Sequence, residues 1–350
     1  MSTIRSIPPS DSMEFELTIP QDMLSSHLLL NEKNKAFPLR RICVFLTLFV
    51  VAVVVIYPLI AYYFYNRVVI KATACVECEP PLIIDDFELK YRDRGSSTTL
   101  PTIIVVHGGP AHSHLSFKDG LDFLEDHTRV IMYDQRGSGL SEVKSDTNKY
   151  TMELLVEELE AVRIASGSEK IVVIGHSFGG ILAQRYALKY PDNVVKVILV
   201  GSVVINSNMG SSFILKYIGP TLYSFFLGFP PKKSADADEW FTFQDESSRL
   251  YNKSNAHLIE DSGPSRFVPW REFSISVAGQ NYESELKAST IPFLIIYGSA
   301  DTRFTGSEAA FSMCSLIPDC NLVEMKQSGH WPFLEEPGQF QSVVLDFLIK

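Results

Sequence analysis

Residues 171–190 constrain the fold of this chain more than any other stretch. They read Ile-Val-Val-Ile-Gly-His-Ser-Phe-Gly-Gly and then continue over 181–190 with helical spacing. The β-branched residues predict a strand, and Gly175-His176-Ser177-Phe178-Gly179 predicts a sharp turn in which only small flanking residues avoid a clash. A strand that turns directly into a helix indicates an α/β fold with a serine held at the end of a strand.

The chain after residue 82 alternates apolar strands with amphipathic helices. We expect strands at 82–91, 102–106, 130–133, 171–174, 194–200, 293–297 and 321–325, and helices at 152–165, 181–190, 306–316 and 339–349. Strands this rich in Val, Ile and Leu predict a mostly parallel sheet with helices on both faces. Residues 203–286 break the alternation and are rich in aromatic side chains, so we expect a helical lid insertion there.

Two other strand ends carry the residues that a nucleophilic serine requires. A serine hydroxyl becomes reactive when a histidine accepts its proton and a carboxylate holds that histidine. Asp301 ends the turn after the strand 293–297, and His330 follows the strand 321–325. Taken singly, Asp301 is consistent with an ordinary turn aspartate and His330 with a surface histidine. Together with Ser177, and in the order Ser, Asp, His, they predict a catalytic triad at the carboxyl edge of the sheet.

Acyl transfer at such a serine also needs two hydrogen-bond donors for the developing oxyanion. The backbone N–H of Phe178, at the start of the helix, is one candidate. The loop after the strand 102–106 reads His107-Gly108-Gly109-Pro110, and its adjacent glycines let a backbone N–H turn inward. We therefore expect Gly109 to be the second donor.

These motifs resemble those of the α/β-hydrolase superfamily over residues 82–350. Within it, His107-Gly108-Gly109-Pro110 and Asp134-Gln135-Arg136-Gly137-Ser138-Gly139 resemble the proline iminopeptidase family of serine peptidases. The resemblance implies an acyl-enzyme mechanism that removes an N-terminal residue, typically proline, from peptides. It also implies a lid glutamate that binds the free amine of the substrate, for which Glu272 is the candidate; a solvated lid glutamate is the alternative.

A second class of function stays open, a lipid esterase of the monoacylglycerol-lipase kind acting at a membrane surface. Residues 213–230 contain the single charge Lys216 among many apolar groups, a composition that suits an interfacial lid as well as lid packing. The net charge of −10, without a basic cluster interleaved with aromatic residues, argues against nucleic-acid binding. The substrate is expected to be a small peptide, amide or ester, with no cofactor and no metal.

An uncharged, apolar segment at 42–65 precedes this domain. At about 1.5 Å per residue it spans about 36 Å, enough for a hydrocarbon core of about 30 Å. We therefore expect a disordered cytosolic tail at 1–41, a transmembrane helix at 42–65, a stalk at 66–81 and the hydrolase domain at 82–350. Basic residues are more frequent before the span than after it, which predicts a lumenal or extracellular catalytic domain.

Cysteine usage and a glycosylation motif agree with that topology. Four cysteines follow the span, which allows three pairings, and Cys314 with Cys320 is the simplest local bridge. The pair Cys75 and Cys78 lacks a second pair of suitable spacing, which argues against a zinc site. Asn252-Lys253-Ser254 is a sequon for N-glycosylation.

Overall fold

The computed structural model describes residues 79–96, 100–202, 249–259, 266–277, 279–301 and 305–350, apart from the side chains of Ala256, Phe267 and Trp270. The chain divides into two units, Met1–Val69 and Ile70–Lys350, and every described residue belongs to the second. The predicted tail, membrane span and most of the stalk therefore lie outside the described residues. Within the described ranges, no helix is long and apolar enough to cross a membrane.

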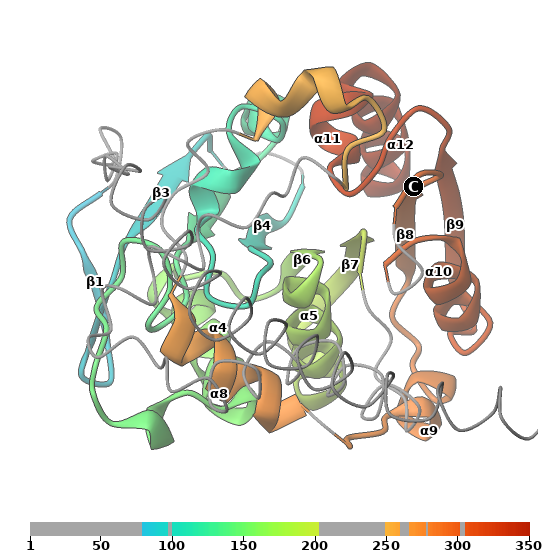
Figure 1. Cartoon of the computed structure of the whole chain (residues 1–350). Helices are drawn as coiled ribbons and strands as arrows, with labels where there is room; N and C mark the ends of the chain where they lie inside the picture. The colour runs from blue at the N-terminus through green and yellow to red at the C-terminus, as the bar shows by residue number, and fades with distance from the viewer. Residues whose placement is uncertain (1–78, 97–99, 203–248, 260–265, 278, 302–304) are drawn as a thin grey trace, which may run out of the picture. The chain divides into compact units, whose positions relative to one another are not determined.

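A seven-stranded sheet forms the centre of the described unit (Figure 1). Its strands lie in the order β3-β5-β4-β6-β7-β8-β9. The strands from β4 to β9 are parallel to their neighbours, and β3 pairs antiparallel with β5 at one edge. Their bounds are Tyr91–Arg94 for β3, Thr102–Val106 for β4, Val130–Tyr133 for β5, Ile171–His176 for β6, Val194–Val200 for β7, Phe293–Gly298 for β8 and Cys320–Met325 for β9. The predicted, mostly parallel sheet is confirmed.

The prediction of one strand over 82–91 is wrong. The structure has a separate two-stranded antiparallel sheet of β1 (Leu82–Ile84) and β2 (Phe87–Leu89), and then the edge strand β3. The chain turns at Asp85, whose φ of 53° lies in the left-handed region that aspartate tolerates better than most residues. The turn separates the apolar residues of β1 from the alternating apolar and charged residues that follow it.

Helices cover both faces of the sheet, as predicted. One core contains residues of α4 (Met152–Ala165), α5 (Phe178–Lys189), α8 (Phe267–Val277) and α10 (Ser307–Cys314). The other contains residues of α11 (Pro332–Glu335) and α12 (Pro337–Ile349). Strand β4 contributes apolar residues to both cores, because Ile104 and Val106 face the first core while Ile103 and Val105 face the second.

Of the described residues in the predicted lid insertion, two segments are α-helical, namely α8 and the short α9 (Glu283–Lys287), which ends one residue beyond it. The remainder of 203–286 is described only at 249–259 and around these helices, where a 3₁₀ segment covers Lys253–Leu258. Further 3₁₀ turns lie at His114–Phe117, Asp122–Asp126, Thr147–Lys149 and Pro191–Asn193. Helix α5 begins at Phe178 rather than at the predicted residue 181, so it starts directly after Ser177.

Candidate active site

The carboxyl ends of the parallel strands bring the predicted triad residues to one edge of the sheet. Ser177 follows β6 immediately, Asp301 lies three residues after β8, and His330 lies five residues after β9. Strand β7 runs between β6 and β8, and β9 flanks β8 on its other side. Because neighbouring parallel strands end at the same edge, the three residues share that edge of the sheet despite their separation in sequence.

Ser177 occupies a strained turn between β6 and α5. Its φ of 54° and ψ of −119° lie outside the regions that ordinary residues favour. The turn is possible because both flanks are glycine: a Cβ atom on Gly179 would lie 2.2 Å from the Val106 carbonyl oxygen, and one on Gly175 would lie 2.5 Å from the Gly179 carbonyl oxygen. Close backbone packing on both sides of Ser177 is therefore the reason that the flanking residues must be small, as predicted. Ser177 itself is 8% exposed.

His330 and Asp301 form a buried pair. The Nδ1 atom of His330 lies 2.7 Å from Oδ2 of Asp301, and the two side chains are 2% and 0% exposed. The second carboxylate oxygen of Asp301 accepts a hydrogen bond from the Thr305 hydroxyl at 2.8 Å. A carboxylate held in this way can fix the orientation and tautomer of the imidazole.

His176 links the serine turn to the His330 turn. Its Nε2 atom donates to the backbone carbonyl of His330 at 2.9 Å, and the two rings lie 4.6 Å apart between centroids. Burial lowers the pKa of His176 well below its usual value, so the ring is neutral near pH 7. The ring of His176 thereby fixes the backbone that carries His330.

The loop after β4 lies against the serine. A Cβ atom on Gly108 would lie 2.9 Å from the Cβ of Ser177. The Nδ1 atom of His107 donates to the Gly108 carbonyl at 2.9 Å, while its Nε2 accepts from the backbone N–H of Gln135 at 3.1 Å. In a trans peptide the N–H points opposite to the C=O, so the N–H of Gly109 is directed away from the His107 ring. The loop is thus held by a histidine whose pKa burial lowers to about 4.

The segment after β5 is buried, and its charged side chains Asp134 and Arg136 are paired with neighbouring residues. Asp134 accepts hydrogen bonds from the backbone N–H and Nδ1 of His114 at 2.6 and 2.8 Å, and from the N–H of Leu140 at 2.7 Å. Burial opposes ionisation of Asp134, but the contacts with His114 outweigh it and lower the pKa of the carboxyl. Arg136 pairs with the buried Glu158 of α4, Nε to Oε2, at 2.8 Å.

Glu272 lies on α8, the helix that reaches the start of α5. The ring of Phe273 packs 6.3 Å from that of Phe178, which brings α8 next to the turn that follows the serine. The Glu272 carboxylate is ion-paired with Arg271, whose Nε donates to Oε1 at 2.9 Å, and its side chain is 21% exposed. The expected amine-binding carboxylate therefore lies on a helix next to that turn and is paired with an internal cation.

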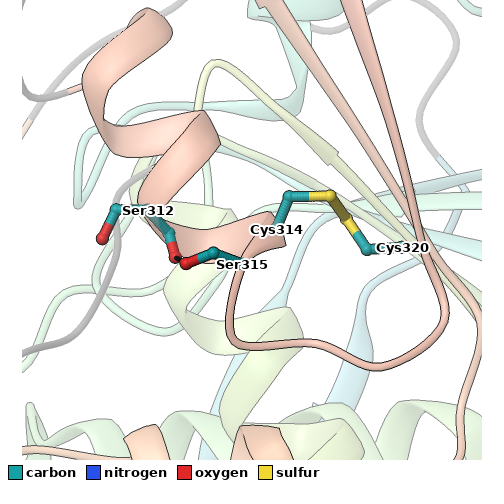
Figure 2. The surroundings of a disulfide bond; sticks show 4 residues. All are labelled: Ser312, Cys314, Ser315 and Cys320. Carbon is teal, nitrogen blue, oxygen red and sulfur yellow. Dashed lines mark hydrogen bonds between the residues drawn. A yellow bond between two sulfur atoms is a disulfide. The ribbon is translucent and has the colours of Figure 1, made fainter.

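The remaining predicted sites lie at the surface or away from the serine. Cys314 and Cys320 are joined in a disulfide between the end of α10 and the start of β9, with Cα atoms 5.5 Å apart (Figure 2). Asn252 is exposed, and its Oδ1 atom accepts from the backbone N–H and hydroxyl of Ser254 at 3.1 and 2.8 Å.

Three residues of the site were not predicted as such, namely His176, Thr305 and Arg249. Thr305 lies four residues after Asp301, and these two residues are not part of a recognisable sequence motif. Arg249 lies just after the part of the insertion that is outside the described residues, and it reaches Asp301 through tertiary contact. No local pattern in the sequence marks either of them.

Comparison with known proteins agrees with the fold. The family model described as the alpha/beta hydrolase fold matches residues 101–337. The chain is 27% identical over 290 residues to a proline iminopeptidase of Lactobacillus delbrueckii subsp. lactis, covering 73% of this chain and 92% of that protein.

Solved structures show the same fold. A proline iminopeptidase of Mycobacterium smegmatis superposes with a TM-score of 0.57 at 21% identity, over 77% of this chain and 97% of the other. A thermophilic esterase of Thermogutta terrifontis superposes with a TM-score of 0.60 at 22% identity, over 80% of this chain and 98% of the other. Peptidases and esterases are thus about equally similar in fold.

Proposed function

Because the chain belongs to the α/β-hydrolase family, a family of hydrolytic enzymes, we propose that it is a serine hydrolase with the triad Ser177, His330 and Asp301. The observation that carries this proposal is the buried His330–Asp301 pair, 2.7 Å apart, at the sheet edge where Ser177 occupies its strained turn. A buried carboxylate bound to Nδ1 leaves Nε2 of His330 as the base.

The chemistry follows from these roles. Nε2 of His330 accepts the hydroxyl proton as the Ser177 oxygen attacks the carbonyl carbon of an amide or ester. The protonated imidazole then gives that proton to the leaving amine or alcohol, and an acyl-enzyme remains. Water attacks the acyl group by the same proton transfer, which releases the carboxylic acid and restores the serine.

The N–H groups of Phe178 and Gly109 serve as the oxyanion hole in this proposal. Phe178 is the first residue of α5, so its N–H has no partner within the helix. The Gly108 carbonyl is tied to His107, which directs the following N–H away from that ring. Removing a single oxyanion donor from a serine hydrolase costs about 3–4 kcal/mol of transition-state stabilisation.

For the substrate we propose peptides with a free N-terminus, from which the enzyme releases the N-terminal residue as proline iminopeptidases do. The similarity to such enzymes over most of their length supports this class. Glu272 is the candidate ligand of the substrate amine, since its helix packs against Phe178.

A lipid esterase is the second candidate, and one observation favours it. The Glu272 carboxylate is already paired with Arg271, so an incoming ammonium group must compete with a resident guanidinium. An ester without a positive charge meets no such competition. Similarity of fold to an esterase is consistent with either substrate.

We further propose that residues 42–65 anchor the protein as a single membrane helix, with the N-terminus cytosolic and the catalytic domain lumenal or extracellular. The apolar sequence of that segment and the excess of preceding basic residues support this topology. The exposed position of Asn252 suits a glycan on that side of the membrane.

The nucleophile is tested by labelling the purified protein with a fluorophosphonate, which reacts with activated serines. The wild type should be labelled at Ser177, and Ser177→Ala should lose both labelling and turnover. Ser312→Ala, which changes an exposed serine on α10, is the matched control and should behave as wild type. A folded Ser177→Ala variant that keeps more than about a thousandth of the wild-type rate would contradict the proposal.

The substrate class is tested at Glu272. Glu272→Gln should lower kcat/KM about tenfold to a hundredfold on prolyl amides with a free amine, because a charge-assisted contact contributes about 1.5–3 kcal/mol. It should leave monoacylglycerol esters unaffected. Arg271→Gln removes the competing cation and keeps the carboxylate, so it should not lower kcat/KM on the same amides. Equal losses on both substrates, or none, would remove Glu272 from the binding site and favour the esterase.

A further inference from the structure

The backbone of Arg249 is joined to the turn that carries His330. The carbonyl oxygen of Arg249 accepts the backbone N–H of His330 at 2.9 Å. A Cβ atom on Gly329 would lie 1.9 Å from that same oxygen, so the approach requires glycine there. The Glu335 carboxylate ties the two segments a second time, because it accepts the N–H of Tyr251 at 2.7 Å and the N–H of Gly329 at 2.6 Å.

The side chain of Arg249 reaches the other member of the pair. Its guanidinium donates to the Thr305 hydroxyl oxygen at 3.1 Å and lies 3.5 Å from Oδ1 of Asp301. Thr305 in turn donates its hydroxyl proton to that same Oδ1 at 2.8 Å. The opposite oxygen, Oδ2, is the one bound to His330. Both carboxylate oxygens are therefore held, one by the histidine and one by the Arg249–Thr305 contacts.

We infer that Arg249 is a positioning residue of the catalytic site. Its carbonyl fixes the backbone of His330, and its guanidinium fixes the carboxylate of Asp301 through Thr305. A single residue from within the insertion thereby contacts both halves of the His–Asp pair. This inference rests on the proposed function, since it assigns the residue that orients the proposed base.

The charge of Arg249 adds a second, measurable effect. Among the described residues, the titratable and charged groups next to His330 or its turn include Asp301 from the turn after β8, His176 from β6, Glu335 from α11 and Arg249 itself. Burial keeps His176 neutral, so Arg249 supplies the positive charge of this set. A positive charge close to the pair opposes protonation of the imidazole. Arg249 should therefore keep His330 competent as a base at lower pH than it otherwise would be.

The experiment measures the rate of fluorophosphonate labelling from pH 5 to 9, which requires no knowledge of the substrate. Arg249→Gln should lower the plateau rate about tenfold or more, and should move the midpoint of the acid limb upward by about half a unit to one unit. Arg249→Lys keeps the charge without the planar fork, so it should restore the midpoint but only part of the plateau. Arg94→Gln is the matched control, because it removes one arginine at the opposite edge of the sheet.

The outcomes separate this inference from the proposed function. If the wild type is labelled at Ser177 and Arg249→Gln matches Arg94→Gln in plateau and midpoint, the positioning role is wrong and the hydrolase proposal stands. A wild type that is not labelled overturns both. Should Arg249→Gln fail to fold, Thr305→Val decides, since it removes the hydroxyl between Arg249 and Asp301. A lower plateau in that variant supports the inference, and an unchanged plateau overturns it.

Discussion

Replacing Gly201 with alanine should damage the active site far more than it damages the fold. Gly201 follows β7, has a φ of +50°, and donates its N–H to the Ile296 carbonyl at 2.9 Å. A Cβ atom there would lie 3.0 Å from Nδ1 of His330 and 3.3 Å from Oδ2 of Asp301. Those two atoms are the ones joined by the 2.7 Å hydrogen bond of the proposed triad.

The expected magnitudes come from two separate effects. The left-handed conformation costs an L-residue about 1–2 kcal/mol, which should appear as a loss of unfolding free energy. The contact requires His330 and Asp301 to move by a few tenths of an ångström, although their side chains are 2% and 0% exposed and have little room. Because a displacement of about 1 Å can cost a hundredfold in rate, we expect a tenfold to hundredfold loss of labelling rate.

A matched variant separates these effects. Gly167 has a φ of +72°, and a Cβ atom there would meet nothing within 4 Å. Gly167→Ala should therefore lose about the same 1–2 kcal/mol in urea unfolding while its labelling rate stays at the wild-type value. Gly201→Ala should lose both. If the two variants were equally destabilised and equally active, the His330–Asp301 pair would not be the reacting centre, and our geometric reasoning would be refuted.

The other predictions concern stability, pH and glycosylation. Glu158→Ala should lower the unfolding free energy in urea by about 3–5 kcal/mol, because it leaves the buried Arg136 guanidinium without its main partner. Burial lowers the pKa of His107 to about 4, so the unfolded state binds a proton at higher pH than the folded state does. The unfolding free energy should therefore fall from about pH 6.5 towards pH 4, by up to about 1.4 kcal/mol per pH unit. His107→Gln should show a shallower slope. The wild-type labelling rate should fall below about pH 6–7 with a one-proton slope, and a two-proton slope would contradict a single base. Glycosidase treatment should shift the wild type but not Asn252→Gln on a gel, unless the catalytic domain is cytosolic.

The sheet could be predicted because its inner strands are buried on both faces. In β4 every residue is buried, and such strands appear in the sequence as unbroken apolar stretches with turn residues at each end. The positions of Asp301 and His330 followed from strand ends alone, since parallel topology brings strand ends together. The two-residue turn at Asp85 was missed because the alternating residues 87–91 continue the pattern of one strand, whereas the hairpin depends on one left-handed residue.

The residues that hold the triad could not be predicted in the same way. Arg249 bonds to Asp301, Thr305 and His330 across the fold, and its own neighbours in sequence carry no periodic pattern. His176 was visible next to Ser177, but its bond to the His330 carbonyl depends on how the last turn packs. Reacting groups lie at positions that topology fixes, whereas supporting groups lie wherever tertiary packing places them.

The two buried histidines next to the site explain why a single titration should govern its activity. His107 fixes the loop beside Ser177 through the Gly108 carbonyl, and His176 fixes the turn of His330 through a backbone carbonyl. Each ring donates one proton to a backbone carbonyl, and His107 must also stay neutral to accept the N–H of Gln135. Burial lowers the pKa of His107 to about 4 and that of His176 well below its usual value, so both hold their geometry where an active-site base titrates. Burial thus keeps the two supporting histidines neutral, while His330 is the histidine proposed to change its charge during the reaction.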